Sequence, residues 1–202
     1  MISTSTIYFR SLKEEGKICQ SAILFATPLI KLYNNYMVMG YDSKNPIVRF
    51  YFRSIISTVV KFIEKCPNKE LILDFGCGQQ FLKKNYHFNV IGYDIIPEYT
   101  DVKNYVDLKP DIIICNHSLE HLSKNDLIHT LNNFLKIKPK NLIIALPTEN
   151  IFSKIGSLLF RPGSHRQHKT KASFIEQELA KRFYMIDKNN LYTLTVISNW
   201  KT

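Results

Sequence analysis

Short apolar runs alternate along this chain with longer segments in which apolar residues recur every three or four positions. The runs lie at residues 71–75, 89–94, 111–115 and 141–146, and a weaker one lies at 104–106. Because the strong runs are continuous rather than alternating, they are typical of strands buried on both faces of a parallel sheet. Strands that alternate with helical segments predict an α/β fold, a doubly wound and mostly parallel sheet with helices on both faces.

Polar residues mark the ends of the helical segments. A capping side chain followed by proline in the first turn starts one helix, and two pairs of serine and acid have the spacing of a capping box. The expected starts are Asn45-Pro46, Ser123 with Asp126, Ser173 with Glu176, and a short helix near Gln79.

The two ends of the chain depart from this alternation. Residues 1–43 mix apolar and polar positions without a strong period, and we expect a helical N-terminal extension there, followed by one domain over 44–202. Near the C-terminus, residues 184–187 and 191–198 are strand-like and flank a Lys-Asn-Asn turn. This arrangement predicts a hairpin at the edge of the sheet.

The bulk composition narrows the class of protein. With 202 residues and 45% hydrophobic content, the chain can bury one sizeable core. The net charge of +10 indicates an anionic partner, whether nucleic acid, an anionic membrane or a phosphorylated substrate; a compositional bias toward Lys, Asn and Ile is the alternative. The four cysteines have no metal-like spacing, so we expect reduced thiols, no zinc site and a cytoplasmic protein.

The longest apolar stretch near the N-terminus is residues 18–30, which Gln20 and Pro28 interrupt. It falls short of the roughly 20 apolar residues that a membrane-spanning helix needs. We expect it to lie as an amphipathic segment on a surface, either that of the protein itself or that of a membrane.

A glycine pair follows the first strong run. Gly76 and Gly78 allow backbone torsions and a close approach that side chains would prevent. A loop for a dinucleotide would need a third glycine at position 81, where Phe81 stands. Asp74, just before the loop, would repel a pyrophosphate but suits a cationic group, which favours S-adenosylmethionine, a cofactor with an ammonium and a sulfonium.

A second acidic residue supports a cofactor that contains a nucleoside. Asp94 ends the second run, 16 residues after Gly78. In a doubly wound sheet the ligand lies beyond the carboxyl ends of the strands, where the strand order reverses, and a carboxylate there accepts the hydroxyls of a ribose. Together with the glycine pair, Asp94 therefore predicts a nucleoside pocket.

Several motifs in this order resemble those of class I S-adenosylmethionine-dependent methyltransferases, and most closely the small-molecule branch. They are LILDFGCG, VIGYD, DIIICNHSLEHL, NLIIALPTENIF and the H-x-x-H-K-T before the next helix, and the resemblance covers about residues 47–198. It implies a Rossmann-like, seven-stranded sheet whose last hairpin supplies an antiparallel strand. The one departure in the glycine loop is Gln80, where a third small residue is usual, and its side chain either narrows the pocket or points to solvent.

The resemblance also implies roles for individual residues around the cofactor. The glycine loop and the aspartate before it would face the methionine part, and the residues after the second, third and fourth strands would meet the ribose, the adenine and the sulfonium. In chain order these are Asp74, Gly76 and Gly78 (methionine), Asp94 (ribose), Ile95 and Asp107 (adenine), and Asn116 and His117 (beneath the sulfonium).

The histidines after the fourth expected strand are the candidates for acid–base chemistry. Alignment alone can lower the barrier of a displacement reaction by about 7–11 kcal/mol, so a base is optional. His117 and His121 are four residues apart at the start of a helix and are expected to share a face. Either they take a proton from an acceptor hydroxyl, or they pack as structural elements; Glu120 between them is interpreted as a hydrogen-bonding partner.

Residues 150–175 contain no acid and five basic residues, and the resemblance places them in the substrate lid. Their apolar stripe beside a basic turn fits an anionic membrane or a phosphorylated acceptor; a buried helix followed by a solvated basic loop is the alternative. His165 and His168 lie here, but the sequence places no third ligand beside them, so we predict no metal site.

The sequence therefore predicts a cytoplasmic S-adenosylmethionine-dependent methyltransferase that acts on a small molecule or on a glycan or lipid intermediate, with peripheral membrane contact as one option. An RNA methyltransferase is the alternative that the charge supports, although NHSL at 116–119 differs from the N-P-P-[YF] tetrapeptide of amide methylation. A non-catalytic binding protein is the alternative that Gln80 suggests.

Overall fold

The computed structural model describes residues 40–148 and 168–202, and the chain divides into one unit over 1–39 and another over 40–202. The predicted helical extension therefore lies almost wholly outside the described residues, and so does most of the predicted lid. Residues 40–42 form a turn ahead of the first described helix. No helix in the described part of the chain is long and apolar enough to cross a membrane.

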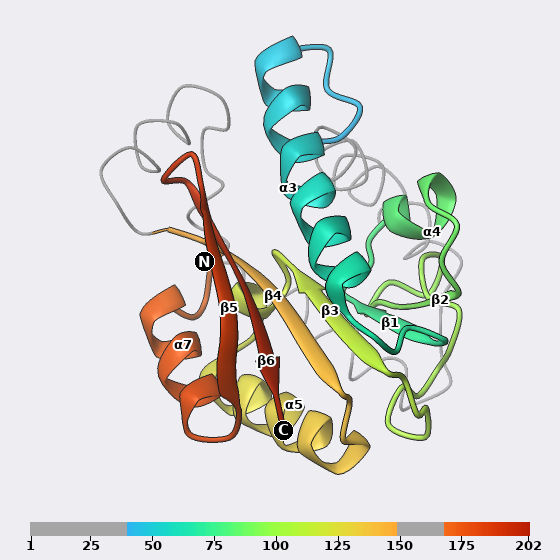
Figure 1. Cartoon of the computed structure of the whole chain (residues 1–202), viewed down its shortest axis with the longest axis vertical. Helices are drawn as coiled ribbons and strands as arrows, with labels where there is room; N and C mark the ends of the chain where they lie inside the picture. Colours follow the sequence, from blue (N-terminus) through green and yellow to red (C-terminus); the bar gives the residue numbers. More distant parts are fainter. Residues whose placement is uncertain (1–39, 149–167) are drawn as a thin grey trace, which may run out of the picture. The chain divides into compact units, whose positions relative to one another are not determined.

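One sheet organises residues 40–202 (Figure 1). Its strand order is β2-β1-β3-β4-β6-β5, in which β1 to β4 are parallel and β6 is antiparallel to both of its neighbours. The strand order reverses between β1 and β3, as the doubly wound prediction requires. The strands are β1 (Ile72–Phe75), β2 (Val90–Tyr93), β3 (Ile112–Asn116), β4 (Asn141–Pro147), β5 (Tyr184–Leu191) and β6 (Thr195–Lys201).

Helices cover both faces of the sheet, which confirms the predicted fold class (Figure 1). Successive strand residues enter opposite cores: Leu73 and Ile113 pack with α5 and α7, whereas Ile72 and Ile112 pack with α3 and α4. The helices are α3 (Pro46–Lys65), α4 (Phe81–Asn85), α5 (Lys124–Ile137) and α7 (Ala172–Ala180), with a short 3-10 helix, η1, at Leu119–His121.

Two of the predicted helix starts are confirmed. The Asn45 side chain accepts the backbone N–H of Ile47 at 2.9 Å, one residue before α3 begins at Pro46. Ser123 accepts the backbone N–H of Asp126 at 3.2 Å and caps α5. These caps satisfy N–H groups that the first turn of a helix leaves without partners.

The short helix predicted near Gln79 also forms; its N-cap is Gln80, with a left-handed backbone at φ of 59°, and its first residue is Phe81. The predicted capping box at Ser173 is wrong. α7 begins before Ser173, and its N-cap Lys171 has no side-chain capping bond. The hydroxyl of Thr170 instead donates to the carbonyl of Leu122 at 2.7 Å, which anchors the chain just before the helix.

The sheet of the described residues has six strands, not the predicted seven. The missing one is the weak run at 104–106, where the side chain of Asn104 accepts the backbone N–H of Val106 at 3.1 Å and closes a turn. Tyr105 is buried in the core from this turn, so an apolar position here does not require a strand. Asn side chains compete with sheet bonds in this way.

The predicted C-terminal hairpin forms, but its turn lies elsewhere. The Lys-Asn-Asn segment at 188–190 is paired within β5, and the chain reverses at Tyr192 and Thr193, which have φ values of 51° and 58°. This register places Thr195 and Ile197 in the interior with 0% exposure. Burial of these side chains sets the register and overrides the turn propensity of the asparagines.

Candidate active site

The carboxyl ends of β1, β2 and β3 bring most of the predicted site residues to one edge of the sheet. The glycine pair follows β1, Asp94 follows β2, and Asn116 ends β3. The backbone N–H of Gly78 donates to Asp94 Oδ2 at 2.9 Å, and that of Gly76 donates to the carbonyl of Tyr93 at 2.7 Å. The loop after β1 is thus hydrogen-bonded directly to the end of β2.

Gly76 requires glycine for two reasons. Its φ is +76°, in the left-handed region, and a Cβ built on it would lie 2.4 Å from Cβ of Ser118. No side chain fits such a gap without movement of backbone, because Ser118 belongs to the loop after β3. Gly76 is therefore the place where the loops after β1 and β3 touch.

Asp74 is a buried carboxylate at the end of β1, with only 7% of its surface exposed. Burial, and then the charge of Asp94, raise the pKa of Asp74 from 3.8 to about 7. No donor among the described residues is hydrogen-bonded to this carboxylate, so its negative charge has no partner there. A cationic ligand group would supply one, and an ammonium or sulfonium fits this chemistry.

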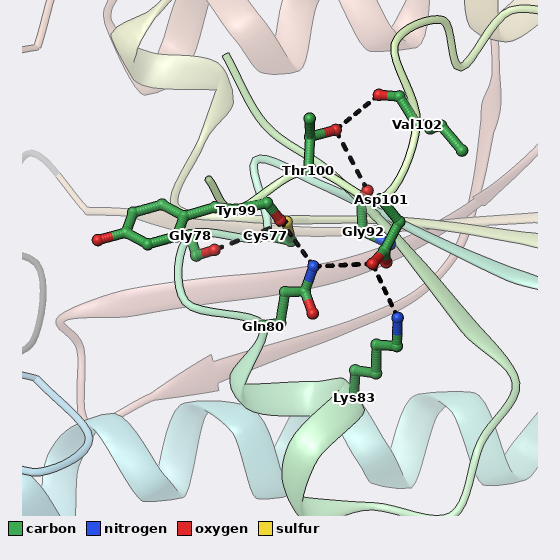
Figure 2. A network of polar contacts seen from close by, with 9 residues as sticks. All are labelled: Cys77, Gly78, Gln80, Lys83, Gly92, Tyr99, Thr100, Asp101 and Val102. Atoms are coloured by element: carbon green, nitrogen blue, oxygen red, sulfur yellow. Dashed lines mark hydrogen bonds and ion pairs between the residues drawn. The ribbon is translucent and has the colours of Figure 1, made fainter. Parts of the chain in front are cut away.

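Gln80 does not point into solvent. Its amide donates to the carbonyl of Tyr99 at 2.7 Å and to Asp101 Oδ1 at 3.1 Å, and Lys83 pairs with the same carboxylate at 2.9 Å (Figure 2). The backbone of Gln80 also keeps the left-handed conformation that a glycine adopts readily. The glutamine thus fastens the loop after β2 to the start of α4.

The same network includes Cys77, whose thiol donates to the carbonyl of Tyr99 at 3.3 Å (Figure 2). Burial, and then the nearby carboxylates, raise the pKa of Cys77 well above its usual value. The residue is therefore a neutral thiol that packs, not a reactive thiolate. Its sulfur would lie 2.7 Å from a Cβ built on Gly92, so β2 needs glycine at that position.

The two residues assigned to the adenine lie in different settings. Ile95 directly follows Asp94 and is 82% exposed. Asp107 is exposed in the turn that replaces the expected strand, and it accepts from the amide of Asn104 at 2.7 Å. Their roles stay predictions; Asp107 differs from the prediction in having no strand before it.

Asn116 ends β3 and meets a residue that the sequence assigned to the N-terminal extension. Its amide donates to the hydroxyl of Tyr41 at 2.6 Å, while its Oδ1 is buried and has no partner in the described part of the chain. The Tyr41 ring stacks on Phe81 with centroids 4.2 Å apart. Tyr41 therefore lies between the start of α4 and the end of β3.

His117 is held from both sides of its ring. Nδ1 lies 3.1 Å from Glu120 Oε1, and Nε2 lies 3.2 Å from the hydroxyl of Thr195, which is 2.5 Å from the hydroxyl of Tyr51. Its backbone φ is 53°. To accept a proton from an acceptor, the ring would have to exchange one of these partners, so its catalytic role stays a prediction.

The predicted shared helical face for His117 and His121 is wrong. η1 begins only at Leu119, so His117 precedes the helix. Glu120, in η1, is 1% exposed and meets His117, as the hydrogen-bonding interpretation expected. Although burial raises it, the hydrogen bond from His117 and the charges of His117 and His121 hold the pKa of Glu120 below its usual value.

Sequence reasoning missed three residues of this region: Tyr41, Tyr51 and Thr195. Tyr51 lies on α3 and Thr195 begins β6, and 144 positions separate them in the chain. No local pattern marks them, because each reaches the site only through the packing of α3 against the sheet.

Comparisons with known proteins agree with this geometry. A family model described as a methyltransferase domain matches residues 47–191. No curated protein matches the chain at a significant level of sequence similarity.

Several solved structures share the fold. The N-methyltransferase NodS from Bradyrhizobium japonicum WM9, solved with S-adenosyl-L-homocysteine, is 10% identical, with a TM-score of 0.58 over 80% of this chain and 90% of that one. Magnesium protoporphyrin IX methyltransferase from Synechocystis PCC 6803, solved with S-adenosylmethionine, is 15% identical, with a TM-score of 0.56 over 85% and 90%. The small RNA methyltransferase HEN1 is 16% identical, with a TM-score of 0.57 over 74% of this chain and 25% of that one.

At these identities the solved structures show the fold, and the family model, which covers well over half of the chain, shows the family. The chain belongs to the methyltransferase-domain family and is a class I S-adenosylmethionine-dependent methyltransferase.

Proposed function

We propose that this methyltransferase binds S-adenosylmethionine at the carboxyl ends of β1 to β3 and methylates a small molecule or a glycan or lipid intermediate. The observation that carries the cofactor site is Asp74, a buried carboxylate without a donor among residues 40–148 and 168–202, beside a glycine loop whose Gly78 is hydrogen-bonded to Asp94. A dinucleotide would bring a pyrophosphate against two carboxylates, whereas S-adenosylmethionine brings cationic groups and no phosphate.

Each residue contributes through binding and orientation. Asp74 would pair with the ammonium, and Gly76 and Gly78 would let the backbone approach the methionine part closely. Asp94 already accepts the N–H groups of Gly78 and Ile96, and its remaining lone pairs would accept the ribose hydroxyls. When bound, S-adenosylmethionine supplies an electrophilic methyl carbon that a heteroatom of the acceptor displaces.

The residues after β3 would act on the acceptor side. Asn116 Oδ1, which has no partner among the described residues, would accept a hydrogen bond from a hydroxyl or amine of the acceptor. His117 would hold the acceptor proton only if it releases Thr195 or Glu120, since both ring nitrogens have partners. Alignment by these groups is therefore the main contribution that the site can make, and base catalysis by His117 is the second.

A small-molecule or intermediate acceptor is the first choice because the domain carries no recognisable RNA-binding motif in its sequence and because the fold is shared with NodS and with magnesium protoporphyrin IX methyltransferase. The alternative is RNA, supported by the net charge of +10 and by the fold shared with HEN1. We also propose a cytoplasmic location, with contact at an anionic membrane surface. The free thiols of Cys66, Cys77 and Cys115 support a reducing compartment.

Calorimetric titration of the full chain with S-adenosylmethionine tests the cofactor site. Replacement of Asp94 by Asn should weaken binding by about 10–100-fold, because a hydrogen bond to a charged group contributes roughly 1.5–3 kcal/mol. Asp94→Ala should abolish it in this titration. Asp187→Asn, on the edge strand β5, is the matched control and should bind as the wild type.

Normal binding by folded Asp94→Ala would place the ribose elsewhere, and no binding by folded wild-type protein would leave the chain as a non-catalytic member of its family. The acceptor is tested separately, with methyl-labelled S-adenosylmethionine and cell extract separated into small molecules, lipids, glycans and RNA. Label in the RNA fraction alone would overturn the proposed acceptor class and leave the cofactor site intact.

A further inference from the structure

Three side chains that could ligate a metal meet beside the loop after β3. Glu120 and His121 lie in η1, and His168 lies 47 positions after His121, just before α7. One ligand atom from each residue lies within 4.8 Å of the other two. The sequence offered His165 and His168 without a third ligand; His165 lies outside the described residues, and the fold brings Glu120 and His121 to His168.

Backbone hydrogen bonds hold this arrangement in place. The carbonyl of Glu120 accepts the backbone N–H groups of Lys169 at 2.9 Å and Thr170 at 3.2 Å. Thr170 is buried, and its hydroxyl donates to the carbonyl of Leu122. The segment at 168–170 is therefore hydrogen-bonded to η1 and to the residue after it. The ring centroids of His168 and His121 lie 5.4 Å apart.

The carboxylate of Glu120 gives a second and independent indication. The side chain is 1% exposed, Oε1 lies against His117 Nδ1, and Oε2 is buried with no partner among the described residues. A buried carboxylate oxygen without a donor is costly, and a cation would remove that cost. The contact with His117 is of the kind that orients metal ligands from outside the coordination shell.

We propose that Glu120, His121 and His168 bind one divalent transition-metal ion of the zinc, cobalt and manganese class. Two imidazoles and one carboxylate suit these ions, whereas calcium and magnesium prefer oxygen ligands alone. Three protein ligands leave at least one position for water or for an oxygen of another molecule. Because Glu120 also contacts His117, the ion would lie beside the acceptor half of the site; any part in acceptor binding rests on the proposed function, but metal binding does not.

The three ligand atoms already lie nearly close enough together to bind one ion. With metal–ligand bonds of about 2.0–2.2 Å, two ligands of one ion lie at most about 4.4 Å apart. The outermost pair of atoms, within 4.8 Å, would have to approach by no more than roughly 0.4 Å, which side-chain torsions can provide.

Titration of the chelator-treated full chain with Co²⁺, without a histidine tag and without cofactor, tests the proposal. We expect one equivalent of Co²⁺ to bind with the visible absorption of nitrogen and oxygen coordination, and Zn²⁺ to displace it. His121→Ala and His168→Ala should each weaken Co²⁺ binding by more than about tenfold. Loss of a residue outside the coordination shell costs about tenfold at the least, and loss of a direct ligand should cost more.

His87→Ala removes an exposed histidine outside the cluster and is the matched control, with unchanged Co²⁺ affinity expected. His121 is exposed, so His121→Ala is expected to stay folded even if His168→Ala does not, and circular dichroism checks both. Binding of less than one equivalent, or equal Co²⁺ affinity in wild-type protein and folded His121→Ala, would overturn the site. Because no S-adenosylmethionine is present, this result stands apart from the fate of the cofactor site.

Discussion

The loops after β1 and β3 meet at Gly76 but are completed in different ways. In the loop after β1, polar groups find partners within the protein: Gly78 donates to Asp94, and Gln80 donates to Tyr99 and Asp101 (Figure 2). In the loop after β3, Asn116 Oδ1 and Glu120 Oε2 are buried without partners among the described residues. Each such atom costs on the order of 1–3 kcal/mol.

This contrast separates two tasks at one edge of the sheet. On the β1 side (Asp74, the loop after β1, and Asp94), hydrogen bonds within the protein hold the loop in shape, and the buried carboxylate of Asp74 leaves a charge that a cationic cofactor would pair. The β3 side carries free-energy costs that a bound molecule or ion can remove, as expected where an acceptor or metal completes the site. Forcing the two loops apart should have the largest effect.

Gly76→Ala should be the most damaging single change. A left-handed backbone costs alanine about 1–2 kcal/mol, and the contact with Cβ of Ser118 at 2.4 Å adds roughly 1–3 kcal/mol of overpacking. We expect a loss of about 3 kcal/mol, a fall in Tm of roughly 6–12 °C by calorimetry, and no measurable S-adenosylmethionine binding.

The double variant Gly76→Ala with Ser118→Gly separates the two costs. It removes the clash between the loops but keeps the backbone strain, so it should recover part of the lost Tm. If the double variant is no more stable than Gly76→Ala, the loops do not touch as the structure shows.

The second prediction concerns the charge of the β1 side. Asp74 has a pKa of about 7, so it is largely protonated at pH 5.5 and ionised at pH 8. A cationic cofactor needs the carboxylate, and affinity for S-adenosylmethionine should therefore rise by up to about tenfold per pH unit toward pH 7 and then level off. Asp74→Asn should bind weakly and without this pH dependence; a wild-type affinity that is flat from pH 5.5 to 8 would contradict the pairing.

The same shift affects stability with a definite sign. The folded pKa of Asp74 lies above its ordinary value of 3.8, so the folded state holds a proton that the unfolded state has released. The free energy of unfolding therefore decreases as the pH rises from about 4 through about 7. At pH 8 Asp74→Asn should be more stable than the wild type by urea unfolding, although it loses cofactor affinity.

Much of the β1 side could be predicted from the sequence because its chemistry is local. The strand, the glycine pair and Asp94 lie within about two dozen residues, and their spacing fixes their geometry once the strands are parallel. The sequence left the position of the Gln80 side chain open, because its partners at 99–101 lie on another loop. Local patterns also overstated regular structure, since the side chain of Asn104 closes a turn where a strand was expected.

The β3 side could be predicted only in its own loop. Asn116, His117 and Glu120 are adjacent in sequence, but Tyr41 is 75 positions from Asn116, and His168 is 47 positions from His121. Their meeting depends on how α3 and the segment before α7 pack on the sheet. No spacing rule carries that information, and so the candidate metal ligands were visible only in three dimensions.

A third prediction tests the link from the β3 side to α3. The hydroxyl of Thr195 lies between His117 and Tyr51, where burial raises the pKa of Tyr51 and keeps it protonated. Thr195→Val keeps the shape but leaves both partners unpaired, at a cost of about 1–2 kcal/mol in urea unfolding. Thr195→Ser keeps the hydroxyl and is the matched control. Equal free energies of unfolding for the two variants would contradict the contacts of Thr195 with His117 and Tyr51.

The smallest change in stability is expected at Gln80, on the β1 side. There the informative result is which of two variants, alanine or glycine, is the more stable. Gln80→Ala loses both amide hydrogen bonds, to Tyr99 and Asp101, and keeps the left-handed backbone at φ of 59°. Gln80→Gly loses the same bonds but relieves about 1 kcal/mol of backbone strain. We expect Gln80→Gly to be more stable than Gln80→Ala by roughly that amount, and both to be less stable than the wild type.

Cofactor affinity sharpens this last test. The Gln80 amide holds the loop after β2 and is not part of the proposed cofactor contacts. Both Gln80 variants should therefore bind S-adenosylmethionine only a few-fold more weakly than the wild type, which corresponds to roughly 1 kcal/mol or less. Tighter binding by Gln80→Gly than by wild-type protein would mean that the glutamine narrows the pocket. If Gln80→Ala is as stable as Gln80→Gly, the left-handed backbone at position 80 does not favour glycine there.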